Sequence, residues 1–152
     1  MQARVKLALA VSGCVAAILA VGAGPASAQS VTLKTDMSGA EQCATGTPCD
    51  PDATGKATIT LLPASNTVCF TIKHRNVDPT QAGHIHKAPP GQNNLVIAVN
   101  LYASPGVQSS ISDCVLSDPL TIQDIIMNPT AFYVQEHNQQ FPEGALRGQL
   151  GD

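Results

Sequence analysis

Apolar and polar residues alternate in short runs along most of the chain from residue 31 onward. Val31 and Leu33 alternate with polar neighbours in residues 31–36, and residues 56–62 and 67–73 repeat the same period. Successive side chains of a β-strand point to opposite faces, so this period predicts strands with one buried face. The turn-forming residues 63–66 separate the second run from the third, which predicts a β-hairpin.

The second half of the chain adds further strands and one helix. Residues 81–86 resume the alternation, and the apolar run 95–102 predicts a central strand buried on both faces. Residues 118–128 differ, because Asp118 and Pro119 are typical of a helix start and isoleucines recur at helical spacing. The whole pattern predicts an all-β domain, an antiparallel β-sandwich or barrel, with one short helix near residues 118–128 and two strands after it.

The first 28 residues have the layout of a secretory signal peptide. A short basic start precedes the apolar stretch 7–21, and the small residues 26–28 (Ala-Ser-Ala) form a cleavage site. The apolar stretch is too short, and too rich in Gly and Ala, for a membrane span. Lipidation at Cys14 is an alternative, although the sequence stays hydrophobic beyond Cys14. We therefore expect a secreted or periplasmic protein whose mature chain is a single domain over residues 29–152.

The charge of the expected mature chain narrows the classes of partner. Removal of the signal peptide takes away Arg4 and Lys6 and leaves six basic against eleven acidic residues, a net charge of −5. An acidic surface without a basic run argues against nucleic acid and anionic membranes as partners. The sequence also contains no G-x-S-x-G motif and no glycine-rich phosphate loop before a helix. We therefore expect a protein that is not an enzyme.

Four cysteines remain in the expected mature chain, and an even number in an exported protein predicts disulfides. Four cysteines allow three pairings. Cys43 and Cys49 flank a Gly-Thr-Pro turn in a predicted loop over residues 37–55, so this pair closes easily. Cys69 then pairs with Cys114 across the domain. The alternative is a metal site with thiolate ligands, but no C-x-x-C spacing supports it.

Three of the four histidines fall in predicted strands and form a candidate metal site. His84 and His86 are separated by one residue, so their side chains project to the same face of one strand. His137 lies near the end of another strand. If the two strands are neighbours, three neutral imidazoles can hold copper or zinc. Glu136 or Gln135 could support the ligands from behind, since ligating histidines need their second ring nitrogen held.

A second interpretation of this cluster stays open from the residues alone. A His-x-His pair on a strand can face solvent or hydrogen-bond its neighbours as part of the architecture. The fourth histidine, His74, lies between Lys73 and Arg75. We expect His74 to be an exposed residue at a strand end and not a member of the site.

Three residues near the C-terminus are predicted to have structural roles. Arg147 has the planar, multidentate head suited to bracing a terminal strand, paired with a carboxylate such as Asp78 or Glu143. Gly144 is expected to adopt, in a hairpin turn, a conformation that other residues resist. Tyr133 is expected to lie in or at the rim of the core with its hydroxyl tethered.

Several motifs in the second half of the chain occur in a characteristic order. They are His84-Ile-His86, the turn 91–94, the apolar run 95–102, Cys114, Asn128-Pro129, Tyr133-Val134, His137 and residues 141–150 (Phe-Pro-Glu-Gly-Ala-Leu-Arg-Gly-Gln-Leu). In these motifs the chain resembles the chordin-type domain (CHRD domain) family, and in particular its bacterial exported members. Phe132, Gln135 and Glu136 depart from the family pattern, which usually has tyrosine, asparagine and valine at these places.

The resemblance implies a fold more than an activity. It implies a sandwich or barrel that is superoxide-dismutase-like or immunoglobulin-like. CHRD domains of animals occur in proteins that bind extracellular signalling factors, so the resemblance also implies a non-enzymatic extracytoplasmic binding module with an unidentified protein partner. A more distant likeness to copper–zinc superoxide dismutase rests on fold analogy and the His-x-His strand.

Two other functions remain alternatives at this point. One is a copper-dependent enzyme similar in design to superoxide dismutase, although the four histidines of the chain are too few for the zinc half of that design. The other is a purely structural or adhesive domain without a ligand. Our first expectation is a binding module with a copper or zinc ion at His84, His86 and His137.

Overall fold

Eight antiparallel strands build the structure, a computed structural model that describes residues 29–77, 79–104 and 106–151. The strands are β1 (Val31–Ser38), β2 (Thr54–Leu62), β3 (Thr67–Arg75), β4 (Ala82–Lys87), β5 (Ile97–Ala103), β6 (Ser110–Leu116), β7 (Phe132–His137) and β8 (Leu146–Gln149). They form one sheet in the order β5-β4-β7-β8-β1-β2-β3-β6. The predicted signal peptide and Asp78 lie outside the described residues.

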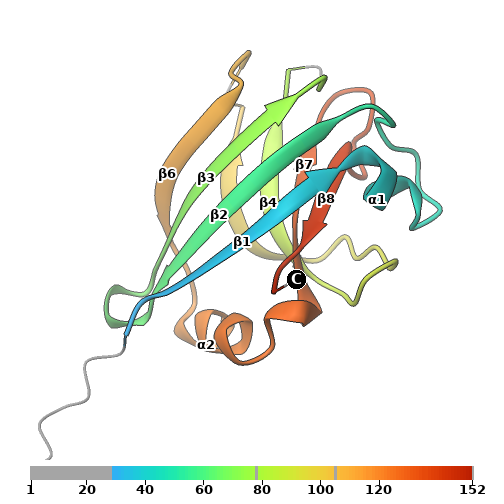
Figure 1. The fold of residues 1–152 in the computed structure, drawn as a ribbon. Coiled ribbons are helices and arrows are strands. Elements are labelled where there is room, and N and C mark those ends of the chain that lie inside the picture. The colour runs from blue at the N-terminus through green and yellow to red at the C-terminus, as the bar shows by residue number, and fades with distance from the viewer. Residues whose placement is uncertain (1–28, 78, 105, 152) are drawn as a thin grey trace, which may run out of the picture.

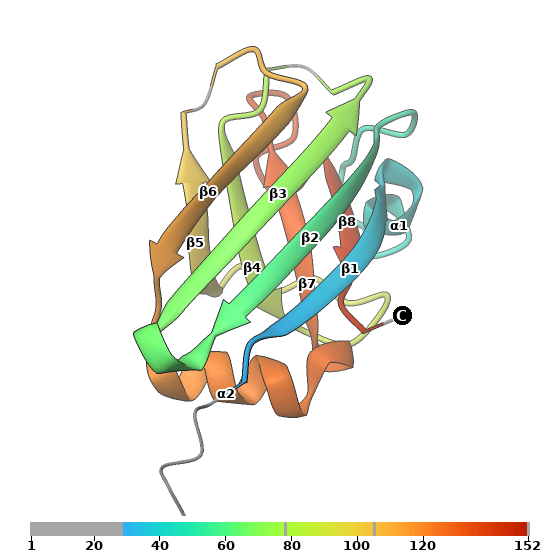
Figure 2. The same cartoon turned by 60° about the vertical axis from the view of Figure 1, so that its left-hand side comes forward.

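The sheet folds back on itself into a nearly closed barrel. Strands β6, β3, β2 and β1 form the front half, and β5, β4, β7 and β8 form the back half (Figures 1 and 2). The halves join where β1 meets β8 through a single registered pair, Ser38 and Arg147. At the opposite side β5 and β6 are the two edges of the sheet. The predicted fold class, an antiparallel sandwich or barrel, is confirmed.

The hydrophobic core fills the space between the two halves. Ile59 and Ile72 contribute from the front strands, and Ile85, Val134 and Leu146 from the back strands, all of them fully buried. Because side chains alternate along a strand, the residues next to Ile85, Val134 and Leu146 must point to the outside of the barrel. This outer face of β4, β7 and β8 is where the candidate site lies.

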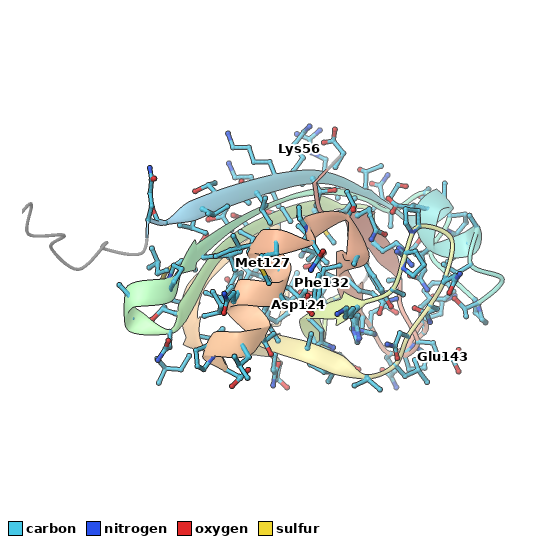
Figure 3. The ribbon with its side chains drawn as sticks, turned by 90° about the horizontal axis from the view of Figure 1, so that it is seen from below. Lys56, Asp124, Met127, Phe132 and Glu143 are labelled. Carbon is cyan, nitrogen blue, oxygen red and sulfur yellow. A yellow bond between two sulfur atoms is a disulfide. The ribbon has the colours of Figure 1, made fainter. Side chains whose placement is uncertain are left out.

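Two α-helices accompany the sheet. α2 (Pro119–Met127) begins at Asp118, whose carboxylate accepts a hydrogen bond from the Thr121 N–H. It lies across the lower end of the barrel, where Ile122 and Ile125 are fully buried (Figure 3). α1 (Gly39–Cys43) is a five-residue helix within a segment predicted as loop. Among the described residues, no helix is long and apolar enough to cross a membrane.

The prediction for the apolar run 95–102 was wrong in one respect. The strand starts only at Ile97 and lies at an edge of the sheet, and Leu95 and Val96 are 64% and 72% exposed. A continuous apolar run does not distinguish an edge strand from a central one. Strand β6 was not predicted, because only Ile111 of its residues is buried and the run has no clear alternation.

Both predicted disulfide pairings are present. Cys43–Cys49 closes the loop that follows α1, and Cys69–Cys114 joins β3 to β6 at directly opposite positions of the sheet. The second bridge links residues 45 positions apart. A cross-link over a long loop restricts the unfolded chain most, so this bridge favours the closed arrangement of the edge strand β6.

Candidate metal centre

Strand geometry brings three histidines to the outer face of the barrel. His84 and His86 flank the core residue Ile85 on β4, so both imidazoles point outward. On the neighbouring strand β7, His137 lies opposite Ala82, and β4 and β7 pair without a break over this stretch. His137 is two residues from Gln135, which lies opposite His84. Residues far apart in the sequence therefore meet on one face.

The three imidazoles converge within reach of one metal ion. One nitrogen from each of His84, His86 and His137 lies within 4.8 Å of the others. Nδ1 of His84 and Nε2 of His137 are 3.1 Å apart. Nitrogen ligands of a tetrahedral zinc are about 3.3 Å apart, as follows from Zn–N bonds of about 2.0–2.1 Å. The His84–His137 pair already has nearly this separation, and ring rotations that shorten the remaining distances would complete such a site.

Backbone carbonyls fix the orientation of two of these rings. Nδ1 of His86 donates to the Val96 carbonyl at 3.0 Å, and Nδ1 of His137 donates to the Pro142 carbonyl at 3.0 Å. In each ring the remaining nitrogen, Nε2, is then the one without a proton. Nε2 of His86 is buried and has no hydrogen-bond partner among the described residues. An unpaired buried nitrogen is unfavourable unless a ligand occupies it, which is the condition of a metal site.

Burial keeps the histidines of the cluster neutral at neutral pH. Desolvation, helped by the neighbouring imidazole of His86, lowers the pKa of His84 to about 4. Desolvation and then the imidazole of His84 lower the pKa of His137 to about 4. Burial also lowers the pKa of His86. A metal ion binds the neutral imidazole, so protons do not compete for these nitrogens near pH 7.

Glu136 does not support these ligands, contrary to one of the sequence-based suggestions. It neighbours His137 on β7, and neighbouring residues of a strand point to opposite faces. Glu136 therefore points into the barrel, where its carboxylate bonds His74 Nδ1 at 3.0 Å and the Tyr102 hydroxyl at 2.5 Å. We call Glu136, His74 and Tyr102 the interior cluster.

The prediction that His74 is an exposed strand-end residue was wrong. His74 is 7% exposed and lies inside the barrel, because it has the same strand parity as the core residues Phe70 and Ile72. Its hydrogen bond to Glu136 outweighs desolvation and raises the pKa of the imidazole. The alternation of β3 already predicts that His74 points into the barrel. The sequence-based prediction relied instead on the charged neighbours Lys73 and Arg75, which are typical of an exposed strand end.

Arg147 is a structural residue of the same outer face as the histidines. Its side chain is fully buried, and the guanidinium carbon lies 3.6 Å from the centre of the Tyr133 ring. It donates to the Gln92 carbonyl and to Gln149 Oε1. Among the described residues its ion-pair partner is Glu41 of α1, at 3.6 Å from Nε, and not Glu143. Asp78, the other carboxylate expected as a partner, lies outside the described residues. The arginine therefore braces α1 and the segment 88–96 against the sheet.

Tyr133 and Gly144 fit their predicted roles as tethered and turn residues. The Tyr133 hydroxyl lies 2.9 Å from Asn93 Oδ1 and accepts from the Asn94 N–H at 2.9 Å. The Tyr133 ring also stacks on His86 at 5.3 Å between centroids. Gly144 has a φ of 133°, and a Cβ there would lie 2.1 Å from Gln135 Nε2. The Tyr133 hydroxyl thus tethers Asn93 and Asn94 to β7, and a side chain at Gly144 would displace Gln135.

Comparison with known proteins gives one match. The family model of the CHRD domain matches residues 33–150, which confirms the resemblance seen in the sequence motifs. Neither the curated proteins nor the solved structures yielded a match. The match covers β1 to β8, and thus all three histidines of the candidate centre.

Proposed function

The chain belongs to the CHRD domain family, and on this basis we propose that it is an exported, non-enzymatic binding module whose ligand is a copper or zinc ion at His84, His86 and His137. The strongest support is the buried, unpaired Nε2 of His86 beside two further imidazoles. Each of these imidazoles is kept neutral by burial. The disulfides suit an exported protein, because such bridges persist in oxidising compartments.

Copper and zinc fit this donor set better than magnesium or calcium. Imidazole nitrogen suits the transition metals, whereas magnesium and calcium prefer oxygen ligands. Divalent copper binds a given nitrogen site more tightly than zinc in the Irving–Williams order. We therefore expect copper to displace zinc from this centre when both are present.

A titration of the purified mature chain tests this function. The metal-free protein is titrated with Cu²⁺ and with Zn²⁺ by calorimetry, alongside His86→Ala. A matched control is Asn100→Ala, which changes an exposed residue opposite His84 on β5. We expect one equivalent to bind to the wild type and to Asn100→Ala, and His86→Ala to bind at least about 100-fold more weakly, because it lacks one of three ligands. Equal affinities in all three proteins would refute the proposed site.

The non-enzymatic part of the proposal has its own test. The copper-loaded protein is assayed for superoxide dismutation against the same quantity of copper bound to albumin. We expect the copper-loaded protein to dismutate superoxide no faster than the copper–albumin control. A faster rate that His86→Ala abolishes would show that the chain is a copper enzyme instead.

A further inference from the structure

Two buried glutamines lie on the same outer face as the three histidines. Gln135 on β7 is fully buried and Gln149 on β8 is 1% exposed. The strand register pairs Gln149 with Tyr133, and Gln135 with Arg147. All four side chains therefore point to the same side of the sheet. The two amides differ in whether the side-chain oxygen accepts a hydrogen bond.

Gln149 uses every group of its amide. Its nitrogen donates to the backbone oxygens of Ala88, Thr130 and Phe132 at 2.8–3.0 Å. Its oxygen accepts from Arg147 Nη2 at 2.6 Å. This amide is a satisfied structural group, as is normal for a buried glutamine.

Gln135 uses only the nitrogen of its amide. Nε2 lies 2.6 Å from Gln42 Oε1, 3.2 Å from Asn93 Oδ1 and 3.1 Å from the Glu143 carbonyl. A backbone carbonyl can only accept, so the Glu143 contact fixes which end of the amide is nitrogen. The oxygen, Oε1, is buried and has no hydrogen-bond partner among the described residues. The amide is thus held firmly by one end and presents an empty acceptor at the other.

The strand register places Gln135 beside the candidate metal centre. Gln135 is directly opposite His84 and two residues before His137 on the same face. Cβ atoms of directly opposite residues are about 5 Å apart. His86 Nε2, the other unpaired atom of this centre, is buried on the same face. A third unpaired buried atom of this face, Arg147 Nε, is 3.6 Å from the Glu41 carboxylate. His86 Nε2 and Gln135 Oε1 remain, and a bound group could supply a partner to both.

We propose that Gln135 Oε1 accepts a hydrogen bond from the fourth ligand of the metal ion. This inference rests on the proposed site at His84, His86 and His137. Three protein nitrogens leave one position of a four-coordinate ion for an exogenous ligand. Since Oε1 can only accept, that ligand must carry a proton, as water does. Bare anions such as chloride and azide lack the proton and are disfavoured, so Gln135 is a positioning residue that selects the ligand.

A pair of matched variants tests the role of Gln135. Gln135→Met keeps the length of the side chain and removes the amide, and Gln149→Met does the same to the equally buried amide whose oxygen is already paired. Each protein is loaded with Co²⁺, whose visible absorption reports the ligands of the ion. We expect Gln135→Met to weaken Co²⁺ binding about 10–100-fold, to change the spectrum and to lower the azide concentration that perturbs it. Gln149→Met should match the wild type in all three.

Equal effects of the two variants would overturn the inference, since both amides would then only hold the fold. The structure of the Zn²⁺-loaded wild type provides a test that needs no variant. We expect Gln135 Oε1 about 2.8 Å from the oxygen of a zinc-bound water. An Oε1 turned instead toward Arg147, its opposite neighbour on β8, would also overturn the inference. Zinc bound elsewhere than at the three imidazoles would refute the proposed function itself.

Discussion

The outer histidines and the interior cluster lie on opposite faces of the sheet, and their surroundings shift the histidine pKa in opposite directions. His137 and Glu136 are adjacent on β7 and point to opposite faces. On the outside, imidazoles meet each other and backbone carbonyls, and burial lowers their pKa values. On the inside, His74 meets a carboxylate, and its pKa is raised. The carboxylate partner of His74 therefore outweighs the effect of burial, which dominates at the outer histidines.

This difference assigns a role to each cluster. Neutral imidazoles with an unpaired nitrogen are suited to bind a cation. His74 is hydrogen-bonded to Glu136, which also accepts from Tyr102, and this cluster instead links β3, β5 and β7 across the barrel. Variants on the two sides should therefore separate stability from metal affinity.

The largest expected effect is on stability, from loss of the carboxylate in the interior cluster. Glu136→Leu leaves His74 buried without its partner, and breaking such a pair costs about 3–5 kcal/mol. The free energy of unfolding is measured in urea. The control Asp36→Asn breaks the exposed pair with Lys56 and should cost less than about 1 kcal/mol. Metal affinity should not change in Glu136→Leu, and a parallel loss of affinity would mean that the two clusters are not independent.

The converse variant acts on the outer side of β7. His137→Gln should reduce zinc affinity at least about 100-fold, because it removes one ligand of three. Its free energy of unfolding without metal should fall by only about 1–2 kcal/mol, since it loses the hydrogen bonds to the Pro142 carbonyl and to His84. Competition with a chromophoric chelator measures the affinity. If the free energy of unfolding falls by several kcal/mol while zinc affinity is unchanged, the histidine cluster has a structural role and does not bind metal.

A smaller effect is expected where the interior cluster is packed against β4. A Cβ at Gly83 would lie 2.2 Å from Tyr102 Cε1, so Gly83→Ala should displace the ring that bonds Glu136. Such overpacking costs about 1–3 kcal/mol. Urea denaturation of Gly83→Ala alone and combined with Tyr102→Leu measures the coupling. The second substitution should remove most of the penalty, and purely additive losses would contradict the proposed contact.

The pH dependence of stability without metal compares the two sides of the sheet in one protein. Between about pH 4 and 6.5 the unfolded chain binds protons at His84 and His137 that the folded chain does not, so stability rises with pH. Above pH 6.5 the folded chain retains the proton on His74 and the unfolded chain does not. Stability therefore falls as pH rises through the raised pKa of His74. The rise should be larger than the fall, because His84 and His137 both contribute to it and only His74 contributes to the fall.

Urea denaturation across pH 4–9 in the presence of a chelator measures this profile. His74→Gln should lose the fall above pH 6.5 and keep the rise below it. A wild-type profile that rises through pH 8 would show that His74 is neutral in the folded protein.

Most of the strands could be predicted from the sequence, because the alternation of apolar and polar residues within a strand depends only on neighbouring positions. The alternation of residues 56–62 and 67–73 predicted β2 and β3, and Asp118 with Pro119 predicted α2. Strand β6 was not predicted because most of its residues are exposed, so apolar side chains do not recur at every second position. The apolar run at 95–97 misled because these residues lie on an exposed edge of the barrel. Edge and centre differ only in tertiary pairing, which the run itself does not encode.

The candidate site was predictable in part for the same reason. The spacing of His84 and His86 fixed their common face, but the proximity of His137 was conditional on its strand being a neighbour, which the pairing of β4 with β7 now shows. The supporting groups were not predictable, because the Val96 and Pro142 carbonyls belong to loops that fold over the face. The sequence suggested Gln135 only as a general support for the ligands. Its unpaired oxygen can be recognised only in the structure, where three acceptors surround the amide nitrogen Nε2.

Imidazole resonances of the metal-free protein, followed by NMR during addition of Zn²⁺, test the central claim most directly. Each of the four histidines is observed at once, so the outer and interior environments are compared in one sample. We predict that the signals of His84, His86 and His137 change together and stop changing at one equivalent, while those of His74 stay in place. A change at His74, or no saturable change at the other three, would contradict the assignment of the outer histidines as a metal centre.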